Sequence, residues 1–164
     1  MGRRSVKEDK SIYMQAREAC GMTREEASEA IDCITPSRLE KLENGRTTMQ
    51  PEDVMLMAKA YREPYLCNYY CTHECAIGKN TVHEIEAKEL PQIAIEMVNG
   101  ISRLDDRKEM ILAIAEDGKL SEDEYKVFNE FRKQLNRLVE SAETLDLWVR
   151  KAAAEGKVNS EDIK

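Results

Sequence analysis

The sequence has few of the features that mark membrane proteins or enzymes. No apolar run approaches the ~18 residues that a membrane-spanning helix needs. It contains no glycine-rich loop that would cradle a phosphate, no nucleophile paired with a base and no paired catalytic carboxylates. An apolar content of 41% leaves little material for a deep substrate pocket. We therefore expect neither a membrane role nor an enzymatic activity.

A secretory leader is also missing, because Met1-Gly2-Arg3-Arg4 is followed by polar residues instead of an apolar stretch. The chain has only five cysteines, a sparse usage that is typical of a reducing compartment. These two observations lead us to expect a cytoplasmic protein.

Charge is what the chain has in excess. Charged residues make up 35% of the 164 residues and give a net charge of −7, which counts against binding to nucleic acid. The acidic excess is uneven, however. Residues 1–64 contain 11 basic and 12 acidic side chains, whereas residues 65–164 contain 14 and 20. The nearly neutral charge of the N-terminal part therefore weakens the argument against DNA binding.

Glycine and proline divide the N-terminal part into four short segments with helical apolar spacing. We expect the first helix to stop at Gly21 and the second to begin with a Thr23–Glu26 capping box. Thr35-Pro36 should start a third helix, because a hydroxyl cap is followed by proline at the first helical position. Pro51 should start a fourth. Their expected apolar stripes consist of Ile12, Ala16, Ala19, Cys20, Ala27, Ala30, Ile31, Leu39, Leu42, Val54, Met55, Met57 and Ala58.

Two longer helices are expected in the C-terminal part, over residues 84–155. The first runs from about 90 to 116, with Leu90, Met97, Leu104 and Ile111 at heptad spacing. The second follows Asp117-Gly118 and a Ser121–Glu124 cap. Two such helices joined by a short turn predict an antiparallel hairpin with coiled-coil packing. The hairpin can close on itself in a monomer, or can form a four-helix homodimer interface through Phe128, Phe131, Trp148 and the row of Met97.

The second and third predicted helices have the pattern of a DNA-reading motif. Ser37, Arg38 and Lys41 are expected on the outer face of the third helix, which a major groove is wide enough to admit. Residues 23–45 resemble the lambda-repressor-like helix-turn-helix of the XRE type. The most specific part is Leu42-Glu43-Asn44-Gly45-Arg46, and the resemblance as a whole extends over residues 8–64. The resemblance implies a bacterial or phage transcriptional regulator whose third helix, residues 35–44, reads double-stranded DNA.

The same resemblance implies a role for several residues. An ion pair between Arg17 and Glu43 would hold the fold. Ser37, Arg38 and Lys41 would read bases, since arginine and lysine donate hydrogen bonds to guanine. Phosphate contacts would come from Thr23, Arg24, Asn44 and Arg46, helped by the free amides at the helix N-termini.

A cysteine-rich segment, residues 65–82, separates the two parts and is expected to be a connector. Cys67, Cys71 and Cys75, with His73, can supply ligands to zinc or to an iron–sulfur cluster. On one unbroken helix Cys67 and Cys75 would be ~12 Å apart, so a shared metal requires a helix break near Thr72. Alternatively the thiols line a buried helix face, or form a redox-switching disulfide. We expect no cofactor as the simplest case.

Together these features predict an all-α fold, a lambda-repressor-like bundle followed by a two-helix hairpin. The expected function is sequence-specific DNA binding by a transcriptional regulator that meets a palindromic operator as a dimer. The alternative is a protein-interaction adaptor or antitoxin-like module, with or without a cysteine-based metal or redox sensor.

Overall fold

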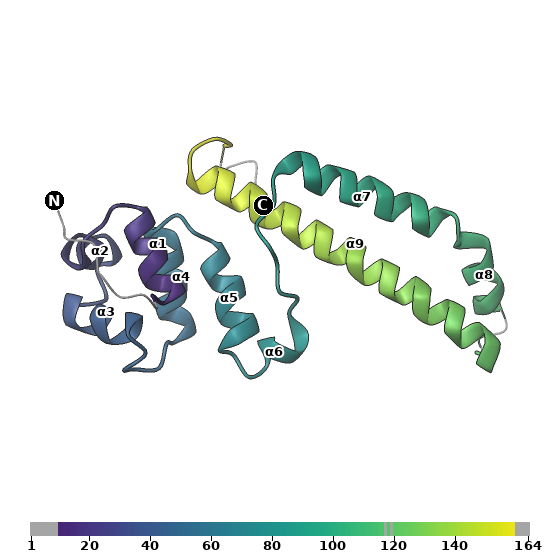
Figure 1. Ribbon diagram of the computed structural model, residues 1–164, viewed down its shortest axis with the longest axis horizontal. Helices are drawn as coiled ribbons and strands as arrows, with labels where there is room; N and C mark the ends of the chain where they lie inside the picture. The colour runs from purple at the N-terminus through teal and green to yellow at the C-terminus, as the bar shows by residue number, and fades with distance from the viewer. Residues whose placement is uncertain (1–9, 117, 119, 160–164) are drawn as a thin grey trace. The chain divides into compact units, whose positions relative to one another are not determined.

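The computed structural model describes residues 10–116, 118 and 120–159, and within these ranges it contains helices and no strands, as predicted (Figure 1). Residues 8, 9 and Asp117, which the sequence analysis assigns to the first domain and to a turn, lie outside the described residues. The chain forms two compact units, Met1–Glu84 with Arg150–Lys164, and Ile85–Val149. The helices are α1 (Ile12–Ala19), α2 (Arg24–Ile31), α3 (Pro36–Glu43), α4 (Pro51–Ala60), α5 (Tyr65–His73), α6 (Gly78–Thr81), α7 (Leu90–Asp105), α8 (Lys108–Glu116) and α9 (Glu122–Ala154).

The first helices begin and end at the residues that the sequence predicts. The Thr23 hydroxyl accepts a hydrogen bond from the Glu26 amide, and the Glu26 carboxylate accepts one from the Thr23 amide, which completes the capping box. Thr35 caps α3 in the same way. Gly21 ends α1 with a φ of +73°, a left-handed conformation that glycine adopts without strain.

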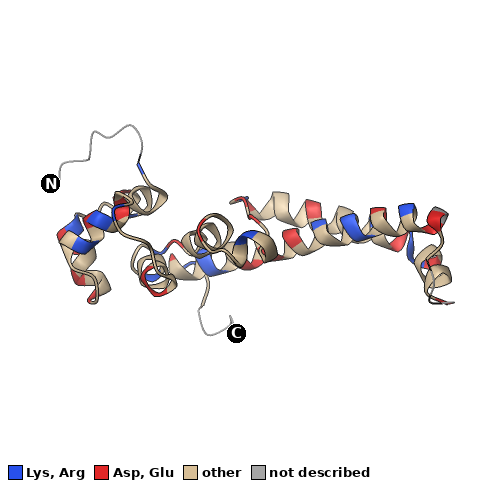
Figure 2. Cartoon of the chain, turned by 90° about the horizontal axis from the view of Figure 1, so that it is seen from below, with Lys and Arg blue, Asp and Glu red and all other residues tan. Residues whose placement is uncertain are grey.

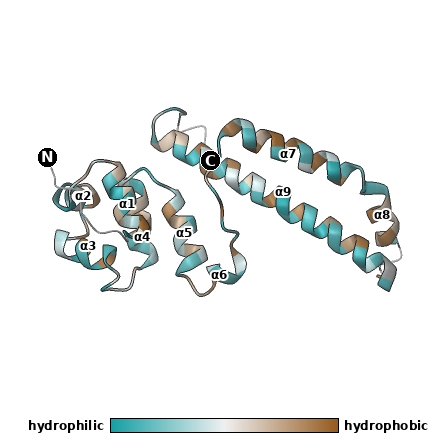
Figure 3. Cartoon of the chain, viewed as in Figure 1, coloured by the Kyte–Doolittle hydropathy of each residue, from teal (hydrophilic) through white to brown (hydrophobic). Residues whose placement is uncertain are grey.

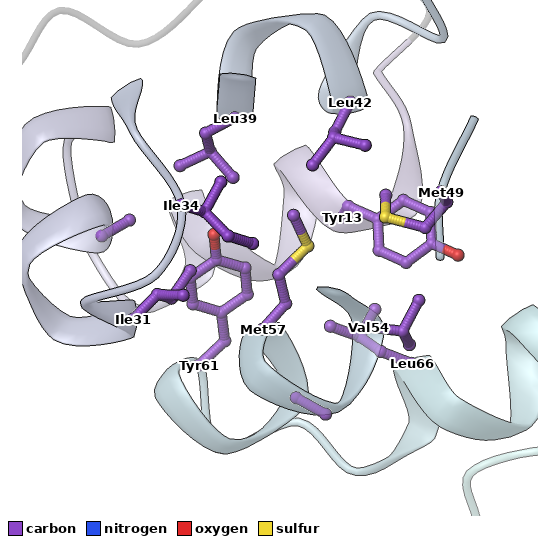
Figure 4. Close-up of a cluster of buried hydrophobic side chains, with 12 residues drawn as sticks. Tyr13, Ile31, Ile34, Leu39, Leu42, Met49, Val54, Met57, Tyr61 and Leu66 are labelled. Carbon is purple, nitrogen blue, oxygen red and sulfur yellow. The ribbon is translucent and has the colours of Figure 1, made fainter. Parts of the chain in front are cut away.

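One hydrophobic core joins α1 to α5 (Figure 4). Leu39 and Leu42 of α3 point toward Met57 of α4, and Leu39 and Met57 are completely buried. The predictions for Ala19, Cys20, Ala30 and Met55 are wrong, since all four residues are exposed, Met55 to 65%. The buried stripe of α4 repeats every three or four residues, and Met55 falls outside it. The stripe consists of Val54, Met57, Ala58 and Tyr61.

The cysteine-rich segment is packed onto this bundle. Leu66 of α5 is completely buried in the core. Gly78 of α6 lies directly against α5, so close that a Cβ atom there would be 2.2 Å from the Cys71 carbonyl oxygen. The end of α9 also belongs to the first unit, where Lys151 forms an ion pair with Glu63 at 2.8 Å. The compact unit is thus larger than residues 8–64.

The second unit contains the expected antiparallel hairpin, formed by α7 and α9 (Figure 1). A Cβ atom on Gly100 would lie 3.3 Å from Leu138 Cδ1, which places these two residues opposite each other. Ile93 of α7 is completely buried. Among the described helices, none is long and apolar enough to cross a membrane.

The single helix predicted for residues 90–116 is instead two helices, α7 and α8. The chain turns at Asp106-Arg107, where the Arg107 amide donates to Leu104 O, three residues back. Aspartate is a weak helix former because its side chain competes for backbone groups, and Asp105 and Asp106 are adjacent here. The heptad pattern of apolar residues continues across this break, so the pattern did not reveal that the helix is interrupted.

Candidate nucleic-acid interface

The turn between α2 and α3 fixes the direction of α3. Asp32 ends α2 in a left-handed conformation with a φ of 63°. The Ser28 hydroxyl then donates a 2.7 Å hydrogen bond to Ile34 O, across the turn. With Leu39 and Leu42 buried beneath it, α3 presents its opposite face to solvent.

This face of α3 carries the three residues that were expected to read bases. Ser37, Arg38 and Lys41 are all exposed. Arg38 is not isolated, because its Nη2 donates a 2.7 Å hydrogen bond to Asp53 Oδ2 on α4. The Arg38 side chain remains 45% exposed whereas that of Asp53 is 6% exposed. Asp53 therefore fixes the position of Arg38 and offsets part of its charge, a role that sequence analysis missed.

Behind α3, the structure brings Arg17 and Glu43 together in a buried ion pair. Arg17 Nε donates to Glu43 Oε1 at 2.5 Å and Nη2 donates to Oε2 at 3.1 Å. Arg17 Nη1 donates to Met22 O at 2.7 Å, so the pair ties α1 to the end of α3 and to the loop before α2. Burial lowers the pKa of Arg17, but its hydrogen bonds to Glu43 outweigh this and the pKa stands above its ordinary value. Arg17 is therefore a charged, structural residue.

Arg24 takes part in the same network. Its Nε donates to Glu43 Oε2 at 2.9 Å, and its side chain is 30% exposed. One buried carboxylate thus accepts hydrogen bonds from two arginines. Since Arg24 was expected to contact phosphate, the structure adds a second, intramolecular partner to that residue.

The remaining candidates for phosphate contacts differ in how free they are. Thr23 has its amide bonded to the Glu26 carboxylate at 2.7 Å, so this amide is already used within the capping box. Asn44 donates from Nδ2 to Glu40 O at 2.7 Å. Arg46 is exposed and directly follows Gly45, which has a φ of +67°.

Acidic residues accompany these cations. Figure 2 shows acidic and basic residues interleaved over the helices of the chain. Glu25, Glu29 and Asp32 of the α2 region and Glu40 of α3 are exposed close in sequence to the reading face. These carboxylates offset part of the positive charge that would attract a phosphate backbone.

The cysteines and His73 do not converge. Within the described residues, no group of three or more His, Cys, Asp or Glu side chains is placed to hold a metal ion. The helix ends next to Thr72, since α5 runs to His73 and leaves Cys75 beyond its end, but Thr72 caps no following helix and its hydroxyl donates to Asn68 O at 2.9 Å. His73 stacks on Tyr69 with 4.3 Å between ring centroids. Cys67 packs against the hydrophobic core, and burial raises the pKa of its thiol.

Comparison with known protein families finds a match within the first unit. Residues 14–65 match the family model described as helix-turn-helix. Neither the search of curated proteins nor that of solved structures gave a match. The matched segment covers α1 to α4, including the capped α2 and α3 and the buried Arg17–Glu43 pair. Residues 14–65 are therefore similar to helix-turn-helix domains, in agreement with the resemblance noted in the sequence.

Proposed function

We propose that this protein is a sequence-specific transcriptional regulator that binds a palindromic operator as a homodimer and reads bases with α3. The observation that carries the proposal is the division of α3 into two faces. Leu39 and Leu42 hold one face in the core, while Ser37, Arg38 and Lys41 stand exposed on the other. A helix with this division can enter the major groove without disturbing the bundle.

The three exposed side chains have suitable chemistry for reading bases. Lys41 and Arg38 donate to guanine O6 and N7, and Ser37 can donate or accept. The Asp53 carboxylate holds Arg38 in one orientation, which lowers the conformational entropy that the side chain loses on binding.

Phosphate contacts would come from the ends of the same helices. Arg46 is exposed beyond the end of α3, and Arg24 has the rest of its guanidinium available beside the Nε that Glu43 holds. Thr23 and Asn44 would add neutral contacts. With so few cations, the binding constant should depend only weakly on salt. The slope of its logarithm against the logarithm of the salt concentration should be about one unit for each neutralised phosphate.

A dimer is needed because one such domain contacts few bases. Two domains on half-sites one helical turn apart, ~34 Å, would bind together and gain affinity from being linked. We assign this linkage to the hairpin of the second unit. The protein would act in the cytoplasm as a binding protein with no catalytic step.

The test is operator selection from random duplexes, followed by binding titrations at several salt concentrations. Lys41→Ala should lower affinity for the selected operator by about 5-fold to 150-fold, the range of one specific contact. Lys59→Ala removes the same charge from an exposed position on α4 and should change affinity little. If no duplex is selected, or if both variants lose affinity equally, the proposal is wrong. A stoichiometric protein partner found in that case would support the adaptor alternative.

A further inference from the structure

The hairpin of the second unit has more apolar surface than it buries. Within its described residues, the buried large apolar side chains are Ile93, which is completely buried, and Ile114, which is 7% exposed. By contrast, Val98 is 63% exposed, Ile101 54%, Leu135 42% and Val139 40%. Figure 3 shows apolar residues recurring along α7 and at intervals along α9. Two helices in a single layer cannot enclose a core, and a second layer is the usual remedy.

Several of the exposed apolar residues lie on one face of the hairpin, whereas Ile95, which is 63% exposed, lies on the side of α7 that points away from α9. On α7 the residues turned toward α9 include Ile93, Met97 and Gly100. The next residue after each of these lies about 100° further round the helix axis, at the side of α7. These next residues are Ala94, Val98 and Ile101. On α9 the half-buried Gln134, Leu138 and Ser141 are likewise followed by Leu135, Val139 and Ala142.

Because α7 and α9 are antiparallel, a step of about 100° along the chain in each helix points toward the same side of the hairpin. The row on α7 and the row on α9 therefore lie on one common face. The Gly100–Leu138 contact sets the register, which places Val98 beside Val139, Ile101 near Leu135, and Ala94 near Ala142. We call these six residues the outer face. It is a continuous apolar surface without a charged residue at its centre.

We propose that the outer face packs against the outer face of a second copy of this chain, with Val98 and Val139 at the twofold axis and the helices of the two copies antiparallel. This inference rests on the proposed function for its biological purpose. The result is a four-helix bundle in which each hairpin supplies one layer.

The sizes of the side chains favour this arrangement. With Val98 and Val139 on the axis, Ile101 lies opposite the partner's Ala94, and Leu135 lies opposite the partner's Ala142. Large residues facing small ones fill a helix interface evenly. In the alternative dimer, α7 of each copy would lie on α9 of the partner. Ile101 would then face the partner's Leu135, and Ala94 would face the partner's Ala142, which leaves an uneven gap.

Charges at the ends of the outer face favour the same arrangement. Arg132 and Asp146 are exposed and lie one heptad before and after Val139 on α9. Inversion about Val139 therefore brings Arg132 level with the partner's Asp146, and the symmetry makes this pair twice. These contacts set the register and orientation more than they add affinity.

The size of the outer face predicts a dimer of modest affinity. The 16 residues of α7 extend about 24 Å, and two helices side by side are about 20 Å wide, which gives roughly 500 Å² in projection for each copy. This is below the ~800 Å² per partner of a standard interface, so dissociation should be measurable in the micromolar range.

Sedimentation of the full chain without DNA tests the inference. The wild-type protein should be a dimer that dissociates on dilution. Val98→Glu should raise the dimer dissociation constant about 100-fold or more, because two carboxylates would be buried at the axis. Met55→Glu, on a side chain 65% exposed in the first unit, is the matched control and should leave the dimer unchanged. A monomeric wild type, or a Val98→Glu variant that still dimerises, overturns the inference.

A charge exchange tests the orientation and does not depend on how Val98→Glu folds. Arg132→Asp should weaken the dimer several-fold, and adding Asp146→Arg to the same chain should restore it, since every copy supplies both residues. Failure of the double variant to recover overturns the antiparallel arrangement. Because no DNA is present, loss of operator binding with an intact dimer would contradict the proposed function alone.

Discussion

Glu43 should be the most sensitive charged position of the first unit. Its carboxylate is completely buried and accepts three hydrogen bonds, two from Arg17 and one from Arg24. In Glu43→Gln the shape is kept, but the charge is lost and an amide NH2 faces the arginines. Arg17, whose side chain is 6% exposed, would then be buried without a counter-charge.

We expect Glu43→Gln to lower the free energy of unfolding of this unit by about 3–5 kcal/mol, the usual effect of removing one partner of a buried pair. Arg24→Ala should cost no more than about 1 kcal/mol, because that side chain is 30% exposed and reaches water. Arg17→Met combined with Glu43→Leu removes both buried charges, and should lose far less than the sum of the single changes.

Urea denaturation followed by circular dichroism at 222 nm measures these differences, with the single variants and the double variant forming a cycle. A loss below about 1 kcal/mol in Glu43→Gln, or strict additivity in the double variant, would refute the argument that the pair is a buried, mutually dependent unit.

Three further outcomes can be checked on single variants and on the wild type. Gly78→Ala should destabilise the α5–α6 contact by about 1–3 kcal/mol in thermal unfolding, because its Cβ would meet the Cys71 carbonyl, whereas an unchanged melting temperature would contradict that close approach. Tyr61→Phe should be neutral or stabilising by up to about 1 kcal/mol, because the buried Tyr61 hydroxyl has no hydrogen-bond partner within the described part of the chain and lies among core side chains (Figure 4); a clear loss would reveal a missing partner. Iodoacetamide should modify the exposed Cys33 before Cys67, whose raised pKa leaves less thiolate at a given pH and moves its rate profile to higher pH; equal rates at neutral pH would argue against burial of Cys67.

Local signals predicted the first four helices well. The capping box at Thr23 and the proline after Thr35 act within a few residues, so the backbone that they specify does not depend on distant contacts. The family resemblance supplied the pairing of Arg17 with Glu43, 26 residues apart, which no local pattern indicates.

Other features were beyond sequence reasoning, for different physical reasons. The Arg38–Asp53 pair joins two helices through a loop whose course no motif specifies. The aromatic and cysteine-rich composition of α5 suggested a connector, whereas Leu66 completes the core. In the hairpin, apolar residues occupy a wide arc of α7, so the heptad pattern alone did not separate the side that faces α9 from the outer face.

The first unit is discontinuous in the chain, and this affects the order in which it can be completed. Arg150–Lys164 belong to it, with Ala152 buried and Lys151 paired with Glu63, yet the ribosome makes them after the whole hairpin. The nascent first unit therefore lacks this segment until the hairpin has been made. A chain that stops before residue 150 would therefore lack the buried Ala152 and the Lys151–Glu63 pair, and its first unit would be less stable.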